Sequence, residues 1–301
     1  MIRVTQGHES GIGLEIFIKS FLLLSSNEQS KFKLYCFQES LKLTLEKSKL
    51  VFDIQDDGII IANTFLSCEW LNGDLPESTV SLNKALSDIS EQEILLTLPT
   101  SKDQLIDDGI QRAGYTEFLR ARYKCDLSML FSSPNENYLL VTDHIPLIDV
   151  TKKINSKLIH KKVKLCLDNF KKYFYSFNEV VFSGLNPHCG ENGLLGDKDS
   201  EINKAIQSLS KEYPITFKGP LSGDTLHLHY RDKNQLFVYM YHDQGLPVFK
   251  AKNHVVGLNI TLGLPFLRMS VDHGTAFNLY GKNLANYLGC HYLLRCALKA
   301  L

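Results

Sequence analysis

The sequence lacks the features that mark several large classes of protein. Its 301 residues carry 33 acidic and 33 basic side chains, so no excess charge is present to attract nucleic acid or an anionic membrane. The longest apolar runs, such as residues 16–24, are interrupted and too short to span a bilayer. The first residues, MIRVTQG, contain no apolar signal region. We therefore expect a cytoplasmic protein that binds neither nucleic acid nor a membrane.

Cysteine is present, but not in the spacing of a metal or disulfide framework. The seven cysteines include no C-x-x-C pair, and we expect them to be reduced core residues. No internal repeat or low-complexity tract interrupts the chain. Lysine is dense in residues 152–172, where apolar residues recur at helical spacing. That pattern favours the solvated face of an amphipathic helix over a nucleic-acid patch.

Short apolar runs alternate with amphipathic stretches along the chain. Strands are predicted at 58–65, 93–99, 138–142, 179–184, 236–241 and 256–263. Helices are predicted at 11–25, 78–88, 102–114, 150–175, 199–212 and 273–300. Nearly continuous apolar strands that alternate with helices predict an α/β fold around a largely parallel sheet.

Three of the predicted strands are followed by a histidine. His144 follows YLLVTD, His188 follows VVFSGLNP, and His242 follows LFVYMY directly. Ligands of open α/β sheets bind beyond the carboxyl ends of the strands, so these imidazoles are expected to line one edge. Three histidines with an open fourth position are typical of a catalytic zinc site. Asp143 and Asp243 lie beside two of them, either to orient a ligand or to form salt bridges with the scaffold.

Further polar residues follow His242 at regular intervals. Lys250, Asn259 and Arg268 are candidates to bind an anionic substrate, since a guanidinium fork and an ammonium suit phosphate or carboxylate. The segment Gly245–Pro247 reads as a turn that would bring Lys250 back toward the substrate. Asp243 and Gln244 are then expected to support the histidine rather than to react.

Seven stretches between residues 5 and 281 form a series of motifs that is specific enough to compare with known protein families. They are TQGHESGIGLE (5–15), GYTEFL (114–119), DHIPL (143–147), SGLNPHCGENGLLG (183–196), GPLSGDTL (219–226), MYHDQGLPVFK (240–250) and GLNITLGLPFLRMSVDHGTAFNLYG (257–281). In this order they resemble the PdxA family, the 4-hydroxythreonine-4-phosphate dehydrogenases of vitamin B6 synthesis. The resemblance covers nearly the whole chain.

The resemblance implies an isocitrate/isopropylmalate-dehydrogenase-like fold, with two α/β domains and an interdomain cleft. Residues 1–120 and 272–301 are expected to form the first domain. Residues 121–271 are expected to form the second, which carries the metal histidines and the dimer interface. The resemblance also implies a homodimer whose active sites are shared across that interface.

The family's site residues can be carried over by position within these stretches. They imply a divalent metal held by His144, His188 and His242, the last from the partner subunit, with Zn²⁺ expected and Mg²⁺ or Co²⁺ as alternatives. The substrate-binding residues that they imply are Tyr115, Thr116, Lys250, Asn259 and Arg268. The dinucleotide, NAD or NADP, is expected to contact Asp224, Ser270 and Asp272.

The implied reaction oxidises 4-phosphohydroxy-L-threonine and then decarboxylates it to 3-amino-2-oxopropyl phosphate. A metal lowers the pKa of the substrate alcohol and stabilises the enolate that forms on loss of CO₂. Lys250 is the expected catalytic residue that takes the proton, with electrostatic positioning of the substrate as its alternative role. The Gly-rich segment 7–13 either presents backbone N–H groups to a phosphate or forms a tight strand-to-helix turn.

The chain also departs from the family pattern. Tyr115 stands where the family pattern GHTEF has histidine, and GEPAGIGPE appears as GHESGIGLE. Tyrosine keeps a hydroxyl but stays neutral where histidine can carry charge. Two alternatives therefore stay open. One is a sister dehydrogenase that acts on another hydroxy acid such as 4-phosphoerythronate, or on a cis-dihydrodiol; the other is a catalytically idle ligand-binding relative.

Overall fold

A computed structural model describes all 301 residues, and the chain divides into two compact units. The first unit contains residues 1–125 and 264–301, and the second contains residues 126–263. The predicted boundaries lie at 120/121 and 271/272, so the chain returns to the first unit earlier than the prediction places it. As a result, Arg268 and Ser270 belong to the first unit.

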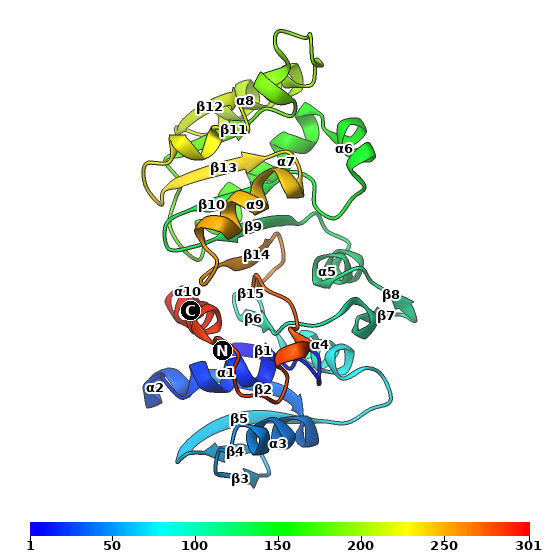
Figure 1. The fold of residues 1–301 in the computed structure, drawn as a ribbon, viewed down its shortest axis with the longest axis vertical. Helices are drawn as coiled ribbons and strands as arrows, with labels where there is room; N and C mark the ends of the chain where they lie inside the picture. Colours follow the sequence, from blue (N-terminus) through cyan, green and yellow to red (C-terminus); the bar gives the residue numbers. More distant parts are fainter. The chain divides into compact units, whose positions relative to one another are not determined.

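The first unit is built on a sheet with the strand order β15-β6-β1-β2-β5-β4-β3 (Figure 1). Neighbours from β15 to β5 are parallel, whereas β4 is antiparallel to both β5 and β3. The strands are β1 (Ile2–Thr5), β2 (Phe32–Phe37), β3 (Phe52–Gln55), β4 (Gly58–Ile61), β5 (Thr64–Leu71), β6 (Ile94–Thr97) and β15 (Leu267–Val271). A separate hairpin pairs β7 (Ile106–Asp107) with β8 (Ile110–Gln111).

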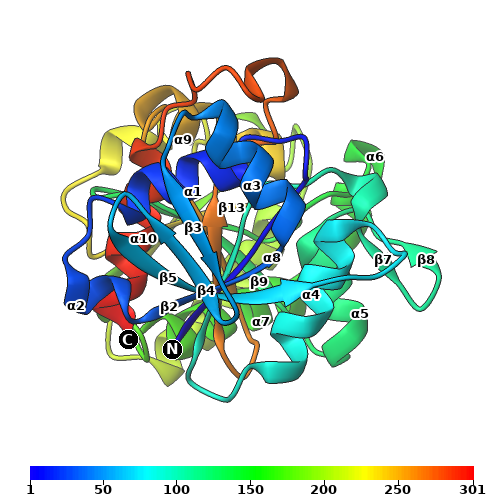
Figure 2. The ribbon, with the colours of Figure 1, turned by 90° about the horizontal axis from the view of Figure 1, so that it is seen from below.

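Helices cover both faces of this sheet. They are α1 (Gly13–Phe21), α2 (Ser26–Gln29), α3 (Gln38–Lys47), α4 (Glu77–Asp88), α5 (Tyr115–Tyr123) and α10 (Leu288–Ala300), with short 3₁₀ turns η1 (Lys102–Gln104) and η4 (Phe277–Leu279). The connections β1–α1–β2 and β5–α4–β6 cross the sheet in opposite directions. Right-handed crossovers therefore place α1 and α4 on opposite faces, as Figure 2 shows. Both α3 and α10 pack against α1.

The second unit has the strand order β12-β11-β13-β10-β9-β14. The first four are parallel, and β9 is antiparallel to both β10 and β14. The strands are β9 (Ser128–Ser132), β10 (Asn137–Leu140), β11 (Glu179–Ser183), β12 (Thr216–Leu221), β13 (Gln235–Tyr239) and β14 (Leu258–Leu262). Its helices are α6 (Leu147–Lys153), α7 (Ser156–Phe170), α8 (Asp199–Glu212) and α9 (His242–Lys252), with 3₁₀ turns η2 (Pro187–Gly190) and η3 (Leu226–His229).

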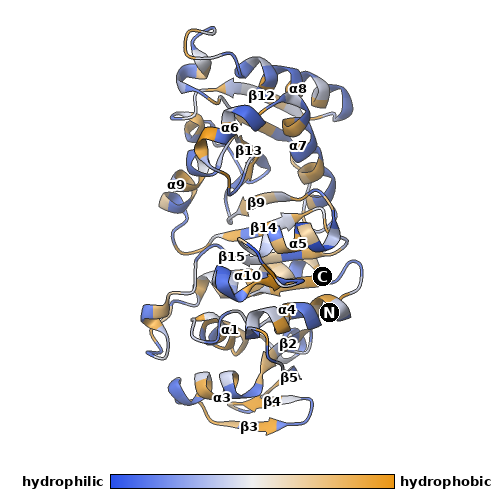
Figure 3. Ribbon diagram, turned by 90° about the vertical axis from the view of Figure 1, so that its right-hand side faces the viewer, coloured by the Kyte–Doolittle hydropathy of each residue, from blue (hydrophilic) through white to orange (hydrophobic).

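Helix α7 carries most of the lysine-rich segment and is amphipathic, as its periodicity predicts. Ile159, Val163 and Phe170 are among its buried residues, and Figure 3 shows hydrophilic and hydrophobic colours alternating along it. It packs against α8, β9 and β14. The predicted helix 150–175 is in fact two helices, since Asn155 interrupts it and accepts a hydrogen bond from the Leu158 N–H as the cap of α7.

The α/β class and the mostly parallel sheets are confirmed, but some element predictions are wrong. The predicted strand 58–65 is a hairpin, because Ala62 and Asn63 both adopt positive φ between β4 and β5. The predicted helix 102–114 contains the β7–β8 hairpin, whose turn is formed by Asp108 and Gly109, also at positive φ. In the predicted helix 273–300, only α10 and the short η4 are helical.

The segment Gly245–Pro247 is not a turn, because it lies inside α9. Proline fixes φ near the helical value and removes one N–H, so a helix can continue through it at a cost. Gly245 is required for packing, since a Cβ there would lie 2.7 Å from the Tyr239 ring. Consequently the chain after His242 rises along a helix instead of folding back. No helix in the chain is long and apolar enough to cross a bilayer.

Candidate active site

Two of the three predicted metal histidines lie together in the second unit. Strands β10 and β13 are parallel neighbours, and their pairing continues past β10, where the Val141 N–H donates to the Tyr239 carbonyl. His144 therefore leaves the sheet beside His242, the first residue of α9. Figure 1 shows β10 next to β13, with α9 packed beside them. Their ring centroids are 5.4 Å apart. Two imidazoles bound tetrahedrally to one Zn²⁺ would have centroids about 5 Å apart, given Zn–N bonds of about 2.1 Å.

His188 has different surroundings. It lies in η2 after β11, with a 66% exposed side chain, and its Nδ1 is 2.7 Å from Glu191 Oε1. The hydrogen bond to Glu191 and its negative charge raise the pKa of His188. The backbone from His188 to Asn192 adopts positive φ throughout, a conformation that residues other than glycine rarely take. No group of three His, Cys, Asp or Glu side chains within one chain is arranged to hold a metal ion.

Gln244 fixes the start of α9. Its Oε1 accepts from the Met240 N–H at 2.8 Å, and its Nε2 donates to the Gly184 carbonyl at 2.6 Å. It thus ties the helix that presents His242 to the ends of β13 and β11. Asp243 has an 85% exposed side chain, and its carboxylate oxygen lies 3.5 Å from Nδ1 of His242. A carboxylate there can orient the imidazole and favour one tautomer.

Lys250 and Asn259 also belong to the second unit. Lys250 is exposed and lies eight residues beyond His242 on α9, a rise of about 12 Å. The predicted turn at Gly245–Pro247 is therefore wrong, while the role of Lys250 at the substrate stays a prediction. Asn259 lies on β14, and its Oδ1 is buried without a hydrogen-bond partner. A buried acceptor in that state is costly unless a ligand or water satisfies it.

The first unit holds a buried arginine. Arg268 on β15 is only 2% exposed, and its Nε and one terminal nitrogen donate to Thr97 Oγ1 at 3.1 and 2.6 Å. Its guanidinium carbon lies 5.0 Å from the centroid of the Tyr115 ring. Burial lowers the pKa of Arg268 to about 10, an effect that Tyr115 opposes, so the side chain stays cationic at neutral pH. Thr116 is buried as well, at 8% exposed, and follows Tyr115 at the start of α5.

Thr97 was not among the predicted site residues. Its only sequence signal is its place at the end of an apolar strand, in the run TLPT. The partnership with Arg268 joins residues 171 positions apart, and no local pattern encodes it.

The predicted cofactor residues are divided between the units. Ser270 is 7% exposed and lies on β15, the strand that carries Arg268, and Asp272 follows the end of that strand. Asp224 lies in the second unit, in the turn between β12 and η3. A hydrogen bond from Ser222 is the main cause that lowers the pKa of Asp224.

The Gly-rich segment 7–13 is a tight strand-to-helix turn. The His8 N–H donates to the Pro99 carbonyl and the Ile12 N–H to the Thr275 carbonyl, both at 3.0 Å. The Ser10 N–H donates to Nδ1 of His8. Because these N–H groups have partners within the first unit, the segment is poorly suited to bind a phosphate.

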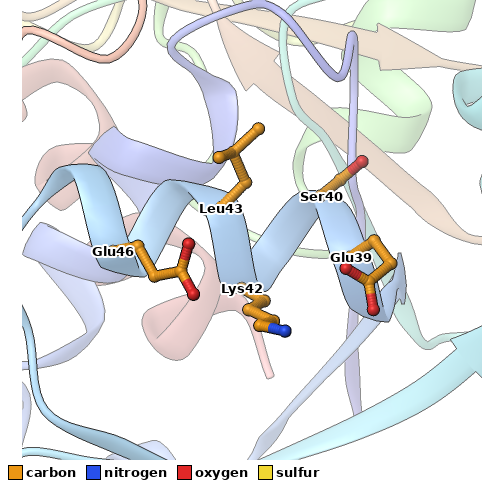
Figure 4. A pocket seen from close by; sticks show the side chains of 5 residues that line it. All are labelled: Glu39, Ser40, Lys42, Leu43 and Glu46. Atoms are coloured by element: carbon orange, nitrogen blue, oxygen red, sulfur yellow. The ribbon is translucent and has the colours of Figure 1, made fainter.

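A shallow hollow on α3 is unrelated to these residues. Its volume is about 280 Å³, and Figure 4 shows that its lining side chains all come from that one helix: Glu39, Ser40, Lys42, Leu43 and Glu46. No second element converges on it. It contains no imidazole or arginine and is not a candidate for the active site.

Comparison with known proteins decides the family. Residues 73–296 match the family model described as pyridoxal phosphate biosynthetic protein PdxA. A 4-hydroxythreonine-4-phosphate dehydrogenase of Sulfurihydrogenibium sp. is 33% identical over 302 residues, which cover 95% of this chain and 93% of that protein. The chain belongs to the PdxA family. It is thus a member of a family of oxidoreductases in pyridoxal phosphate biosynthesis.

Other proteins that this PdxA chain resembles include solved structures and a relative named for a different activity. The crystal structure of 4-hydroxythreonine-4-phosphate dehydrogenase from Klebsiella pneumoniae has a TM-score of 0.78 at 25% identity and covers 100% of this chain and 99% of that one. A protein of Oceanobacillus iheyensis assigned as a D-threonate 4-phosphate dehydrogenase is 32% identical over 314 residues, 95% of this chain and 93% of that protein. Isocitrate dehydrogenase from Methylococcus capsulatus, with a TM-score of 0.52 at 12% identity, covers 99% of this chain and 84% of that one and shows the predicted fold type alone.

Proposed function

We propose that this PdxA-family enzyme oxidises 4-phosphohydroxy-L-threonine with NAD or NADP and decarboxylates the product to 3-amino-2-oxopropyl phosphate. The observation that carries the proposal is the His144–His242 pair, whose ring centroids lie 5.4 Å apart at the ends of neighbouring strands. In a family of dehydrogenases, such a pair is suited to hold a divalent metal at the substrate alcohol.

The donor set fits a divalent metal, with Zn²⁺ favoured and Mg²⁺ or Co²⁺ as alternatives. Imidazole nitrogen suits zinc better than magnesium, which prefers oxygen ligands. One chain brings two imidazoles together but not a third donor. We therefore assign His144 and His242 to one chain and His188 to a second copy, in place of the earlier expectation that the partner supplies His242.

A homodimer would supply that third donor. Large apolar side chains are exposed close in sequence to both His144 and His188: Leu147 at 68%, Ile148 at 74% and Leu194 at 79%. Exposed apolar residues in such numbers favour coverage by a partner. A second copy of the chain would bury them and would bring its His188 toward the His144–His242 pair.

The chain's own residues then have distinct tasks. Arg268, buried and cationic, binds an anionic group of the substrate, to which the Thr116 hydroxyl can donate a hydrogen bond. The buried Oδ1 of Asn259 can instead accept a hydrogen bond from a hydroxyl or ammonium group of the substrate. Lys250 positions a second anionic group or takes the alcohol proton. When bound, a divalent metal supplies Lewis acidity at the alcohol and a nicotinamide cofactor supplies the hydride acceptor. Ser270 and Asp272, together with Asp224, are the residues proposed to meet the cofactor.

A substrate comparison tests the proposal. Purified protein with Zn²⁺, Mg²⁺ or Co²⁺ is supplied with NAD or NADP and one of three substrates: 4-phosphohydroxy-L-threonine, D-threonate 4-phosphate or 4-phosphoerythronate. We expect the first to give the highest kcat/KM, with one CO₂ released per nicotinamide reduced. Preference for a 2-hydroxy acid would instead identify a sister dehydrogenase, since these substrates carry a hydroxyl where the first carries an ammonium. No turnover with any of them would identify an idle relative.

A further inference from the structure

Tyr115 has a hydroxyl that is already engaged within the protein. It is the first residue of α5, and its Oη donates to the Leu98 carbonyl at 2.9 Å, just beyond the end of β6. A phenol has one proton to donate. While it holds the Leu98 carbonyl, Tyr115 cannot donate that proton to a substrate.

The ring of Tyr115 faces a charge. The guanidinium carbon of Arg268 lies 5.0 Å from the ring centroid, within the range of a cation–π interaction. Arg268 also donates two hydrogen bonds to Oγ1 of Thr97, and Thr97 is the residue before Leu98. The parallel pairing of β15 with β6 sets Arg268 opposite Leu95 and so fixes its backbone. Two adjacent residues at the end of β6 thus hold the guanidinium and the ring that supports it.

Because the Arg268 guanidinium is buried, the side chain at position 115 that packs against it must be aromatic and uncharged. Burial raises the pKa of Tyr115 to about 12, while Arg268 and the Thr5 hydroxyl oppose that rise, so the ring stays neutral at physiological pH. A cation–π contact strengthens when water is excluded, and Arg268 is only 2% exposed. A protonated imidazole at position 115 would repel the guanidinium, and a neutral one could not reach Leu98 in the same way, because it is shorter than tyrosine.

We infer that Tyr115 is a positioning residue: its ring orients the Arg268 guanidinium toward the anionic group of the substrate, and its hydroxyl locks the ring to the end of β6. This inference rests on the proposed role of Arg268 in substrate binding. It replaces the direct contact with substrate that the family pattern suggests for position 115. Tyr115 acts through Arg268, so its removal changes substrate affinity more than the rate of the chemical step.

A set of four variants tests the inference: Tyr115→Phe, Tyr115→Leu, Arg268→Met and the double variant Tyr115→Leu/Arg268→Met. For each, KM and kcat are measured with 4-phosphohydroxy-L-threonine, and KM for NAD serves as the internal control. We expect Tyr115→Leu to raise the substrate KM about tenfold, the scale of a desolvated cation–π contact, with kcat changed less than about twofold. Tyr115→Phe keeps the ring and should raise KM less than about threefold.

The double variant distinguishes an effect of Tyr115 on KM through Arg268 from an effect that is independent of Arg268. If Tyr115 works through Arg268, adding Tyr115→Leu to Arg268→Met should raise KM less than about twofold further. Additive effects, or a Phe variant as impaired as the Leu variant, would overturn the positioning role while leaving that of Arg268 intact. An unchanged KM in Arg268→Met would instead overturn the role of Arg268, and this inference with it. Thermal unfolding checks each variant, and Tyr115→Met replaces the Leu variant if that one does not fold.

Discussion

Single charged side chains in the first unit tie its central strands together. Glu93, just before β6, accepts from Arg3 Nε on β1 at 2.9 Å and from the Ser90 N–H at 2.8 Å. Burial alone would raise the pKa of Glu93, but these hydrogen bonds and the Arg3 charge outweigh it, so the net shift is downward. A carboxylate with a depressed pKa stabilises the fold above its unfolded-state pKa and loses that contribution as the pH falls through its folded pKa.

Glu93→Gln should therefore lower the free energy of unfolding at pH 7 by roughly 1 kcal/mol. The difference from the parent should shrink as the pH falls below about 4, where the unfolded-state carboxyl is protonated. Urea unfolding at several pH values measures this difference in the free energy of unfolding. The control is Glu91→Gln, which changes an exposed carboxylate nearby in the sequence. A loss that is constant from pH 7 to pH 3 would show that the charge of Glu93 is not responsible.

The paired histidines make a residue-scale prediction about metal binding. In His144→Ala or His242→Ala, one of two adjacent donors is lost. The affinity for Zn²⁺ should fall by more than the roughly 10–100-fold that loss of an outer-shell partner costs. Bound metal after dialysis against a zinc buffer measures this directly. The matched control is His160→Ala, since His160 lies on α7 and pairs with Glu212. Equal zinc content in His242→Ala and the control would contradict the assignment.

Among the elements, α9 was the hardest to foresee because its sequence contains both glycine and proline. Local propensity argues for a turn at Gly245–Pro247. Tertiary packing overrides it: Leu246 and Phe249 join an aromatic core with Tyr138 and Tyr239, and Gly245 lies flat against the Tyr239 ring. By contrast, α8 was predicted at its observed bounds, because its periodic apolar residues and flanks agree with each other.

Gly245→Ala tests the packing of α9. In an unconstrained helix this change stabilises by about 1 kcal/mol. Here the added Cβ would lie 2.7 Å from the Tyr239 ring, so we expect a net loss of about 1–3 kcal/mol in the free energy of unfolding. Gly274→Ala is the control, since a Cβ there meets nothing within 4 Å. If Gly245→Ala stabilised the protein in chemical denaturation, the close contact with Tyr239 would be refuted.

Across the whole molecule, the sequence predicts best what depends on strand ends. His144 and His242 follow adjacent parallel strands, and that rule alone places them at one edge. The Tyr115–Arg268–Thr97 cluster could not be predicted in this way, because it joins three segments distant in the chain. His188 is a third case. The histidines that are proposed to bind the metal together with His188 belong to a second copy of the chain. Neither the sequence nor a single chain can therefore show how close they come to His188.

Mixed dimers test the proposed division of the metal ligands between two copies. If His144 and His242 share a chain and His188 comes from the partner, a dimer of one His188→Ala chain and one His242→Ala chain keeps one complete site. Random pairing of the two inactive variants by co-expression should then restore about a quarter of the parent activity per chain. Pairing His144→Ala with His242→Ala should restore none, because every site lacks a ligand. Activity recovered by this second pair would place His242 across the interface from His144, and failure of both pairs would show that each chain holds all three ligands.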